Sequence, residues 1–231
     1  MRIQHLGNKK TQNKINRWLF CLLLFSLSLA ASGCALSERR AHPEFEARIH
    51  KVAQPVLIPP DVGMLELLPS GLIRQRDDWS ATGCRNLQNA ISTYLKNEKI
   101  TLKPLIIDSQ IAPEIAEIQA LYRLVHKSMR QQTFNAHQDS QARRPFKYSV
   151  GSINAVLNKL GADSMIFVSG YDRVSNAGRK ALIDIAIADA SGTIVYYSVK
   201  GSIQGYDLRD PASANIMVQE LLSGMSRIKE G

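Results

Sequence analysis

The feature that most constrains this 231-residue chain is an uncharged apolar run that ends just before a cysteine. Residues 18–31 read WLFCLLLFSLSLAA, and the segment before them carries five cations and no acidic residue. A basic head, an apolar middle and small residues behind them are typical of a secretory signal peptide. A membrane-spanning helix needs about 20 apolar residues, more than this run supplies. We therefore expect residues 1–33 to be removed, which leaves residues 34–231 to make the fold.

The residues around the expected cleavage site resemble the lipobox of bacterial lipoproteins. Residues 29–34 read LAASGC, with Ala31 where that family prefers leucine. The resemblance implies cleavage between Gly33 and Cys34, a diacylglycerol on the Cys34 thiol, and a further fatty acid such as palmitate on the freed amine. Two or more acyl chains anchor a protein stably, whereas one gives only marginal binding. Ala35 in place of aspartate implies, by the same resemblance, the periplasmic face of the outer membrane.

A second interpretation of the same residues remains open. Ala31 and Gly33 also satisfy the small-x-small rule of ordinary signal peptidase. Cleavage by that enzyme would release a soluble protein in which the Cys34 thiol is free.

The positive charge of the chain is mostly a property of the leader. The formal net charge is +9, but residues 1–33 carry five of these charges, which leaves +4 for residues 34–231. A basic surface can attract nucleic acid, but this excess is small, and a periplasmic address removes nucleic acid as a natural partner. We expect no nucleic-acid binding.

The remaining cysteine of the processed chain is expected to be inert. Cys84 has no second free cysteine to pair with once Cys34 is modified, so an intramolecular disulfide is excluded. Cys84, Leu87, Ile91 and Tyr94 recur at helical spacing, which places Cys84 on a buried face. Buried thiols are usually unreactive.

The processed chain divides into a short lead and one domain. Residues 34–50 are predicted to be a lipidated N-terminus and a tether, because residues 35–47 (ALSERRAHPEFEA) are charged and show little periodicity. Residues 51–231 have a length typical of one periplasmic domain.

Hydrophobic periodicity predicts an α/β fold. Helices are expected over 78–96, from about 113 to beyond 129, over 150–160 (capped by Ser149 and ended by Gly161), and from 211 after a capping Asp210. Strands are expected over 52–58, 63–68, 99–107, 164–171, 181–188 and 193–203, the last three as a meander. The order β-β-α-β-α-α-β-β-β-α predicts a layered sandwich of a mixed sheet and about four helices.

The sequence proposes no catalytic, metal or cofactor site. Its histidines lack metal-ligand spacing, no Cys-x-x-Cys or Gly-x-Ser-x-Gly occurs, and its glycines form no phosphate loop. We interpret His126 as a residue on the flank of a helix, and Asp77 and Asp78 as acids that favour a helix N-terminus. We expect no enzyme activity and no cofactor.

The most distinctive local feature is the tip between the first two strands of the meander, residues 172–180 (DRVSNAGRK). Arg173, Asn176, Arg179 and Lys180 could dock an acidic partner or a lipid headgroup from an exposed tip. The other interpretation, which we favour, is a solvated loop with a glycine at positive φ.

Three motifs resemble a second group of proteins. Residues 189–197 (DASGTIVYY) resemble a hairpin that recurs in lipoproteins of the curli-secretion-channel type, the penicillin-binding-protein activators, and the amino-terminal domain of the Tol periplasmic protein. Residues 160–170 (LGADSMIFVSG) resemble their glycine-alanine-aspartate strand segment, and residues 176–179 resemble the tip in related proteobacterial lipoproteins. The resemblance extends over about 52–225. It implies a compact α/β domain that works through protein contacts.

Together these features predict a lipid-anchored periplasmic accessory or scaffolding lipoprotein of the outer membrane. Its partner would be an unidentified component of an envelope assembly or secretion machine. Two alternatives stay open: a subunit of an oligomeric outer-membrane secretion complex, which would require homo-oligomers, and a secreted soluble enzyme.

Overall fold

The computed structural model describes residues 36–135, 144–176, 178–203 and 206–226, which form one sheet of seven strands and five helices. The strands are β1 (Leu36–Ala41), β2 (Pro55–Leu57), β3 (Asp61–Leu67), β4 (Ile73–Gln75), β5 (Ser164–Ser175), β6 (Gly178–Asp189) and β7 (Ile194–Ile203). The helices are α2 (Phe45–Ile49), α3 (Asp77–Asn97), α4 (Ala112–Asn135), α5 (Asn154–Leu160) and α6 (Pro211–Ser226). None of these helices is long and apolar enough to cross a bilayer.

The sheet is mixed, as the element order predicts. Its strand order is β1-β7-β6-β5-β3-β4, and β2 pairs with the first residues of β5, ahead of the stretch of β5 that pairs with β3. The pairs β2–β5 and β3–β5 are parallel, whereas the other neighbours are antiparallel. The expected meander over β5, β6 and β7 is confirmed, and β5 and β6 are longer than the sequence pattern predicts.

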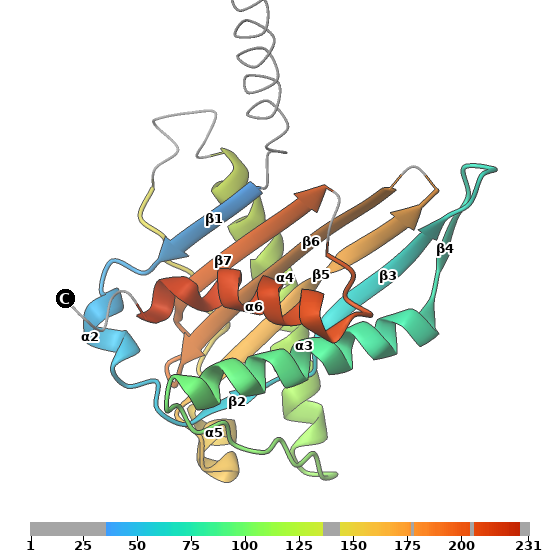
Figure 1. Ribbon diagram of the computed structural model, residues 1–231. Helices are drawn as coiled ribbons and strands as arrows, with labels where there is room; N and C mark the ends of the chain where they lie inside the picture. The colour runs from blue at the N-terminus through green and yellow to red at the C-terminus, as the bar shows by residue number, and fades with distance from the viewer. Residues whose placement is uncertain (1–35, 136–143, 177, 204–205, 227–231) are drawn as a thin grey trace, which may run out of the picture. The chain divides into compact units, whose positions relative to one another are not determined.

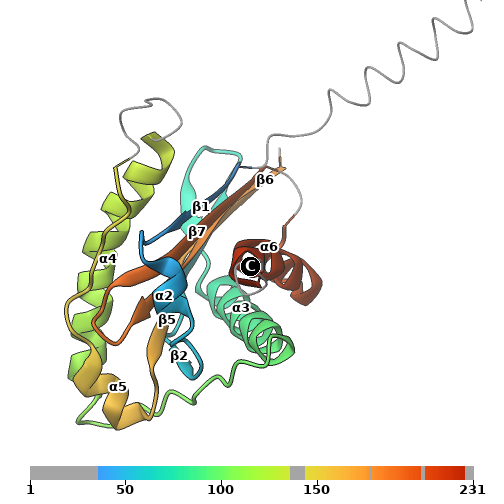
Figure 2. The same cartoon turned by 90° about the vertical axis from the view of Figure 1, so that its left-hand side faces the viewer.

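Helices cover both faces of the sheet (Figures 1 and 2), so the layered α/β sandwich is confirmed. Helices α3 and α6 pack on one face, and α4 and α5 lie on the other. The apolar stripe of α6 is buried as expected (Ala214, Met217, Val218, Leu221, Leu222 and Met225). Strands β5 and β6 contribute apolar side chains to both cores because they are covered on both faces.

Local chemistry accounts for several helix ends. Asp210 accepts a hydrogen bond from the backbone N–H of Ser213 over 3.0 Å, and Pro211 takes the first helical position of α6. Gly161 ends α5 with φ +61°, as expected. The start of α5 is a correction, because Ser149 caps no helix: its Oγ accepts from Gly151, whose φ of +77° breaks the helix there.

The residues expected to form the tether are another correction. Residues 36–41 form β1, which pairs with β7 along its whole length, and α2 buries Phe45 and Ile49 against the core. The strand carries charged side chains, typical of an exposed sheet edge. Distant residues bind two of them: Arg39 donates to the Glu220 carbonyl and Arg40 to the Arg144 carbonyl.

The strand expected over residues 99–107 does not form. Lys99 has φ +60°, which breaks an extended run, and Pro104 lacks an N–H for a ladder. What remains is a single bridge, in which the Lys103 N–H donates to the Pro55 carbonyl over 2.8 Å. The short strand β4, which the sequence analysis missed, completes a hairpin with β3.

Candidate functional site

The carboxylate of Asp184 in β6 is fully buried and has four polar neighbours. Ser169 donates to its Oδ1 over 3.0 Å, and the Tyr122 hydroxyl lies 3.4 Å from the same oxygen. His126 Nε2 lies 2.8 Å from Oδ2, which also accepts from Arg130 Nη2. We call these five residues the Asp184 cluster.

Register and helical spacing bring the Asp184 cluster together. Ser169 and Asp184 are direct partners in the β5–β6 ladder, so their side chains lie on the same face of the sheet. Tyr122, His126 and Arg130 follow one another at intervals of four along α4 and therefore share one face of the helix. The cluster connects α4 to the centre of the sheet.

The charges within the cluster compensate each other. Burial raises the pKa of Tyr122 well above its usual value, and the Asp184 carboxylate raises it further, so the hydroxyl stays neutral. Burial opposes the charged form of Arg130, but the attraction of Asp184 outweighs it and the pKa of Arg130 is raised. A fully buried acid and a partly buried base thus compensate each other's charge.

A serine, a histidine and an aspartate lie within contact distance here, yet their geometry is not that of a catalytic triad. In a triad the carboxylate and the hydroxyl bind different imidazole nitrogens. Here His126 Nε2 faces both Asp184 Oδ2 at 2.8 Å and Ser169 Oγ at 3.3 Å. When this nitrogen donates to the carboxylate it cannot accept the serine proton. The arrangement supports a structural role for His126, with a more specific contact than the helix flank that we expected.

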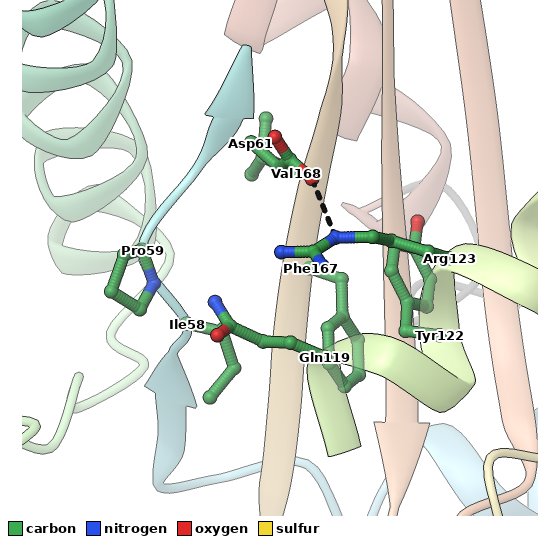
Figure 3. A pocket seen from close by; sticks show the side chains of 8 residues that line it. All are labelled: Ile58, Pro59, Asp61, Gln119, Tyr122, Arg123, Phe167 and Val168. Atoms are coloured by element: carbon green, nitrogen blue, oxygen red, sulfur yellow. Dashed lines mark hydrogen bonds and ion pairs between the residues drawn. The ribbon is translucent and has the colours of Figure 1, made fainter. Parts of the chain in front are cut away.

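Beside the cluster, α4 lines a surface cavity of about 460 Å³, with Arg123, His126, Lys127, Arg130, Gln131 and Phe134 around it. Figure 3 shows a second, much smaller pocket nearby, where Arg123 reaches Asp61 with 3.0 Å between Nε and Oδ2. Of the cations lining the larger cavity, Lys127 is the one without an ion pair among the described residues. The cavity therefore offers little uncompensated charge to a ligand.

The expected docking residues occupy different environments at the β5–β6 tip. Because β5 runs to Ser175 and β6 begins at Gly178, the tip is shorter than the loop expected over 172–180. Arg179 is only 16% exposed and binds Asp172 and Asp207, with 2.7 Å between Nη1 and Asp207 Oδ2. Arg173 and Lys180 face each other across the two strands, and Asn176 is exposed. Arg179, partly buried and paired with two carboxylates, thus differs from the three other residues.

The ion pair between Arg179 and Asp207 belongs to a larger network that the sequence analysis missed. Asp207 also accepts from Arg209 over 2.8 Å, and the Arg209 guanidinium stacks on Trp79, 4.4 Å from the ring centroid. The Arg76 guanidinium lies 4.0 Å from the same centroid. No local pattern indicates this network, because Trp79 and Arg209 are far apart in the chain. The Asp184 cluster had a local indication, since Asp184 interrupts an otherwise apolar strand.

The remaining residues that the sequence analysis singled out are Gly33, Cys34 and Cys84. Gly33 and Cys34, the expected cleavage and lipidation site, lie outside the described residues. Cys84 is half-buried and unpaired, and its thiol lies 3.4 Å from the Pro60 carbonyl oxygen. Burial raises the pKa of Cys84, which agrees with the expectation of an unreactive thiol. In the described part of the chain, no three acidic, histidine or cysteine side chains gather to hold a metal ion.

Comparisons with known proteins gave matches only at the level of structure. No family model and no curated protein matches the chain. PelC from Paraburkholderia phytofirmans, solved as a dodecamer, is similar at 8% identity and a TM-score of 0.38, over 83% of this chain and 96% of that one. Lipoprotein GNA1162 from Neisseria meningitidis is similar at 9% identity and a TM-score of 0.37, over 75% of this chain and 96% of that one.

The C-terminal domain of LpoB from Salmonella enterica is also similar, at 13% identity and a TM-score of 0.29, over 69% of this chain and 96% of that domain. A bacterial lipoprotein is therefore among the solved structures that this chain is similar to. The particular lipoprotein group that the sequence motifs resemble stays a prediction.

Proposed function

We propose that this chain is a lipid-anchored accessory protein of the bacterial envelope, held by acyl chains on Cys34 at the periplasmic face of the outer membrane. The observation that carries the proposal is the apolar run that ends in LAASGC. The fold supports it, because the first strand that the structure describes begins at Leu36, two residues after the cysteine that would be acylated.

We further propose that the domain works by binding other proteins, without catalysis. The polar groups of the Asp184 cluster bind one another, which supports a role in stabilising the fold. Large apolar side chains are meanwhile exposed on helices, including Leu121 and Leu124 on α4 and Ile216 on α6. Exposed apolar side chains that gather on one surface mark contact sites for other molecules, and Leu121 and Leu124 lie one helical turn apart.

Metabolic labelling tests the anchor. Cells that express the chain are grown with an alkyne analogue of palmitate, and the purified protein is analysed by mass spectrometry. We expect label on the wild type and on Cys84→Ala, and none on Cys34→Ala. A wild-type protein with a bare Cys34, or with the leader still attached, would contradict the proposal.

Crosslinking in intact cells tests the protein contacts. We expect adducts with a different envelope protein, and we expect Leu121→Asp combined with Leu124→Asp on α4 to reduce them. A ladder made only of copies of this chain would instead support the alternative of an oligomeric secretion complex.

A further inference from the structure

One end of the sheet gathers the start of β1, the end of β3, the end of β5 and the start of β6 (Figure 1). The register shows this directly, because Leu36 pairs with Gly201, and Gly201 pairs with Leu182 near the start of β6. Strand β3 runs parallel to β5, so the β3–β4 turn projects from the same end. We call this the Leu36 end of the sheet.

Two cations from β5 and β6, Arg173 and Lys180, lie at the Leu36 end. Arg173 and Lys180 are direct partners across β5 and β6, so their side chains lie on the same face. Neither makes an ion pair with any residue that the structure describes, whereas the neighbouring Arg179 is held by two carboxylates. Lysine and arginine side chains that lie near an anionic lipid surface are attracted to it and strengthen binding.

The β3–β4 turn adds exposed apolar side chains to the same end. Leu72 is 66% exposed and Ile73 is 57% exposed. The turn is held by a hydrogen bond from the Leu68 N–H to the Leu72 carbonyl over 2.9 Å, and by the ion pair of Arg74 with Glu66. A fixed turn that presents two large apolar side chains to solvent is suited to the boundary between headgroups and acyl chains.

The position of the proposed anchor indicates that this surface contacts the membrane. Two peptide units separate Cys34 from Leu36, so their Cα atoms lie within about 7 Å of each other in any conformation. Strands of 12 residues, such as β5 and β6, are about 40 Å long, so the opposite end of the sheet is far from the anchor. An acylated Cys34 therefore brings the Leu36 end to the bilayer.

We propose that the Leu36 end lies on an anionic phospholipid bilayer, with Leu72 and Ile73 in the interfacial layer and Arg173 and Lys180 against headgroup phosphates. This inference rests on the proposed function, since it takes Cys34 as acylated. It assigns the β5–β6 tip to lipid, the second of the two occupants that its composition allows.

Depth-dependent quenching tests the inference on the processed, full-length protein in vesicles of phosphatidylethanolamine and phosphatidylglycerol. In a Cys84→Ala background, an environment-sensitive dye is attached at Leu72→Cys, and a lipid-borne quencher is included. The matched control is Ile106→Cys, which is 69% exposed. Ile106 follows Lys103 by three residues. Lys103 forms a bridge to Val56, and Val56 pairs with Met165 near the start of β5, at the opposite end of the sheet. We expect quenching at position 72 to exceed that at 106 by about twofold or more, because only an interfacial dye meets the quencher.

A charge variant tests the cations in the same vesicles. Arg173→Glu with Lys180→Glu should reduce the quenching at position 72. The same charge change at Lys96, in the last turn of α3, and at Lys99, just after that helix, should leave the quenching unchanged. In vesicles of phosphatidylcholine alone, which carry no net charge, the dye at position 72 should be quenched to the same extent in the two double variants.

Flotation of the same vesicles separates failure of this inference from failure of the proposed function. Protein that floats with the vesicles but shows equal quenching at positions 72 and 106 overturns the membrane-facing surface and leaves the anchor intact. Protein that does not float overturns the anchor, and the surface with it.

Discussion

At the scale of the residue, one carboxylate connects helix α4 to the centre of the sheet. Asp184 lies in the middle of β6 and holds a cation from α4, so removing it leaves the Arg130 guanidinium partly buried without its partner. The loss of one member of a buried ion pair costs far more than the loss of an exposed pair.

We therefore expect Asp184→Ala to lower the free energy of unfolding by about 3–5 kcal/mol. The control is Asp61→Ala, which removes an ion pair with Arg123 in which both side chains are 60% exposed. That change should cost less than about 1 kcal/mol. Urea unfolding followed by circular dichroism measures both, and equal losses would show that the Asp184 cluster is not a stabilising unit.

At the scale of the element, the β6–β7 turn depends on a glycine that meets another loop. Asp189 Oδ1 accepts from the backbone N–H groups of Ser191 and Thr193, which closes the turn predicted from its composition. Gly192 has φ +78°, and an added Cβ would collide with the carbonyl oxygen of Gly151. The turn is therefore fixed by packing as well as by backbone conformation.

The packing around Gly192 predicts that Gly→Ala substitutions at positions 71 and 192 lower the free energy of unfolding by different amounts. Gly71→Ala, at φ +85° with open space around it, should cost about 1–2 kcal/mol from backbone strain alone. Gly192→Ala should cost at least about 2 kcal/mol more, because the Gly151 backbone must move as well. Thermal unfolding of the two variants side by side checks the difference, and similar melting temperatures would refute it.

Elements with a strong local pattern could be predicted from the sequence. The α6 stripe, the capping Asp210 and the meander all depend on residues close together in the chain. Strand β1 could not, because LSERRA has no alternating apolar pattern, and its contacts come from β7, from α6 and from the carbonyl of Arg144. Helix α2 had an overlooked indication in the i, i+4 spacing of Phe45 and Ile49.

The Asp184 cluster shows the same limit for the site. His126, Ser169 and Asp184 come from a helix and two strands, and no spacing in the sequence joins the helix to the strands. Only the charge of Asp184 within an apolar strand indicates that a buried partner must exist. In the same way, Arg179 could be recognised as a cation at a tip, but not as the partner of Asp207.

At the scale of the whole molecule, carboxylates that hold distant segments together make stability depend on pH. Burial alone would raise the pKa values of Asp189 and Asp207, but hydrogen bonds from Ser191 and Arg48, and from Arg209 and Arg179, lower them below the usual range. Because these pKa values are lower in the folded than in the unfolded chain, both carboxylates stabilise the fold above about pH 4. Asp172 has the opposite effect on the pH dependence of stability. Burial raises its pKa, although the Arg179 guanidinium acts to lower it.

We expect the urea midpoint of the wild type to fall as the pH is lowered from about 5 towards 2, through the range in which unfolded aspartates take up protons. Asp207→Asn should be less stable at pH 7 and should lose less on acidification, because it has no carboxylate to protonate. A wild-type midpoint that stays constant over this range would exclude Asp189 and Asp207 as net contributors.

The direct passage from Cys34 into β1 sets a limit on reach. If Cys34 carries the proposed acyl chains, one residue, Ala35, separates the anchor from β1. The anchored domain would then reach no further than its own height, about 40 Å along the longest strands, and any protein that it bound would have to come to the lipid surface. A pull on the fatty acids would load the β1–β7 ladder before any other part of the fold.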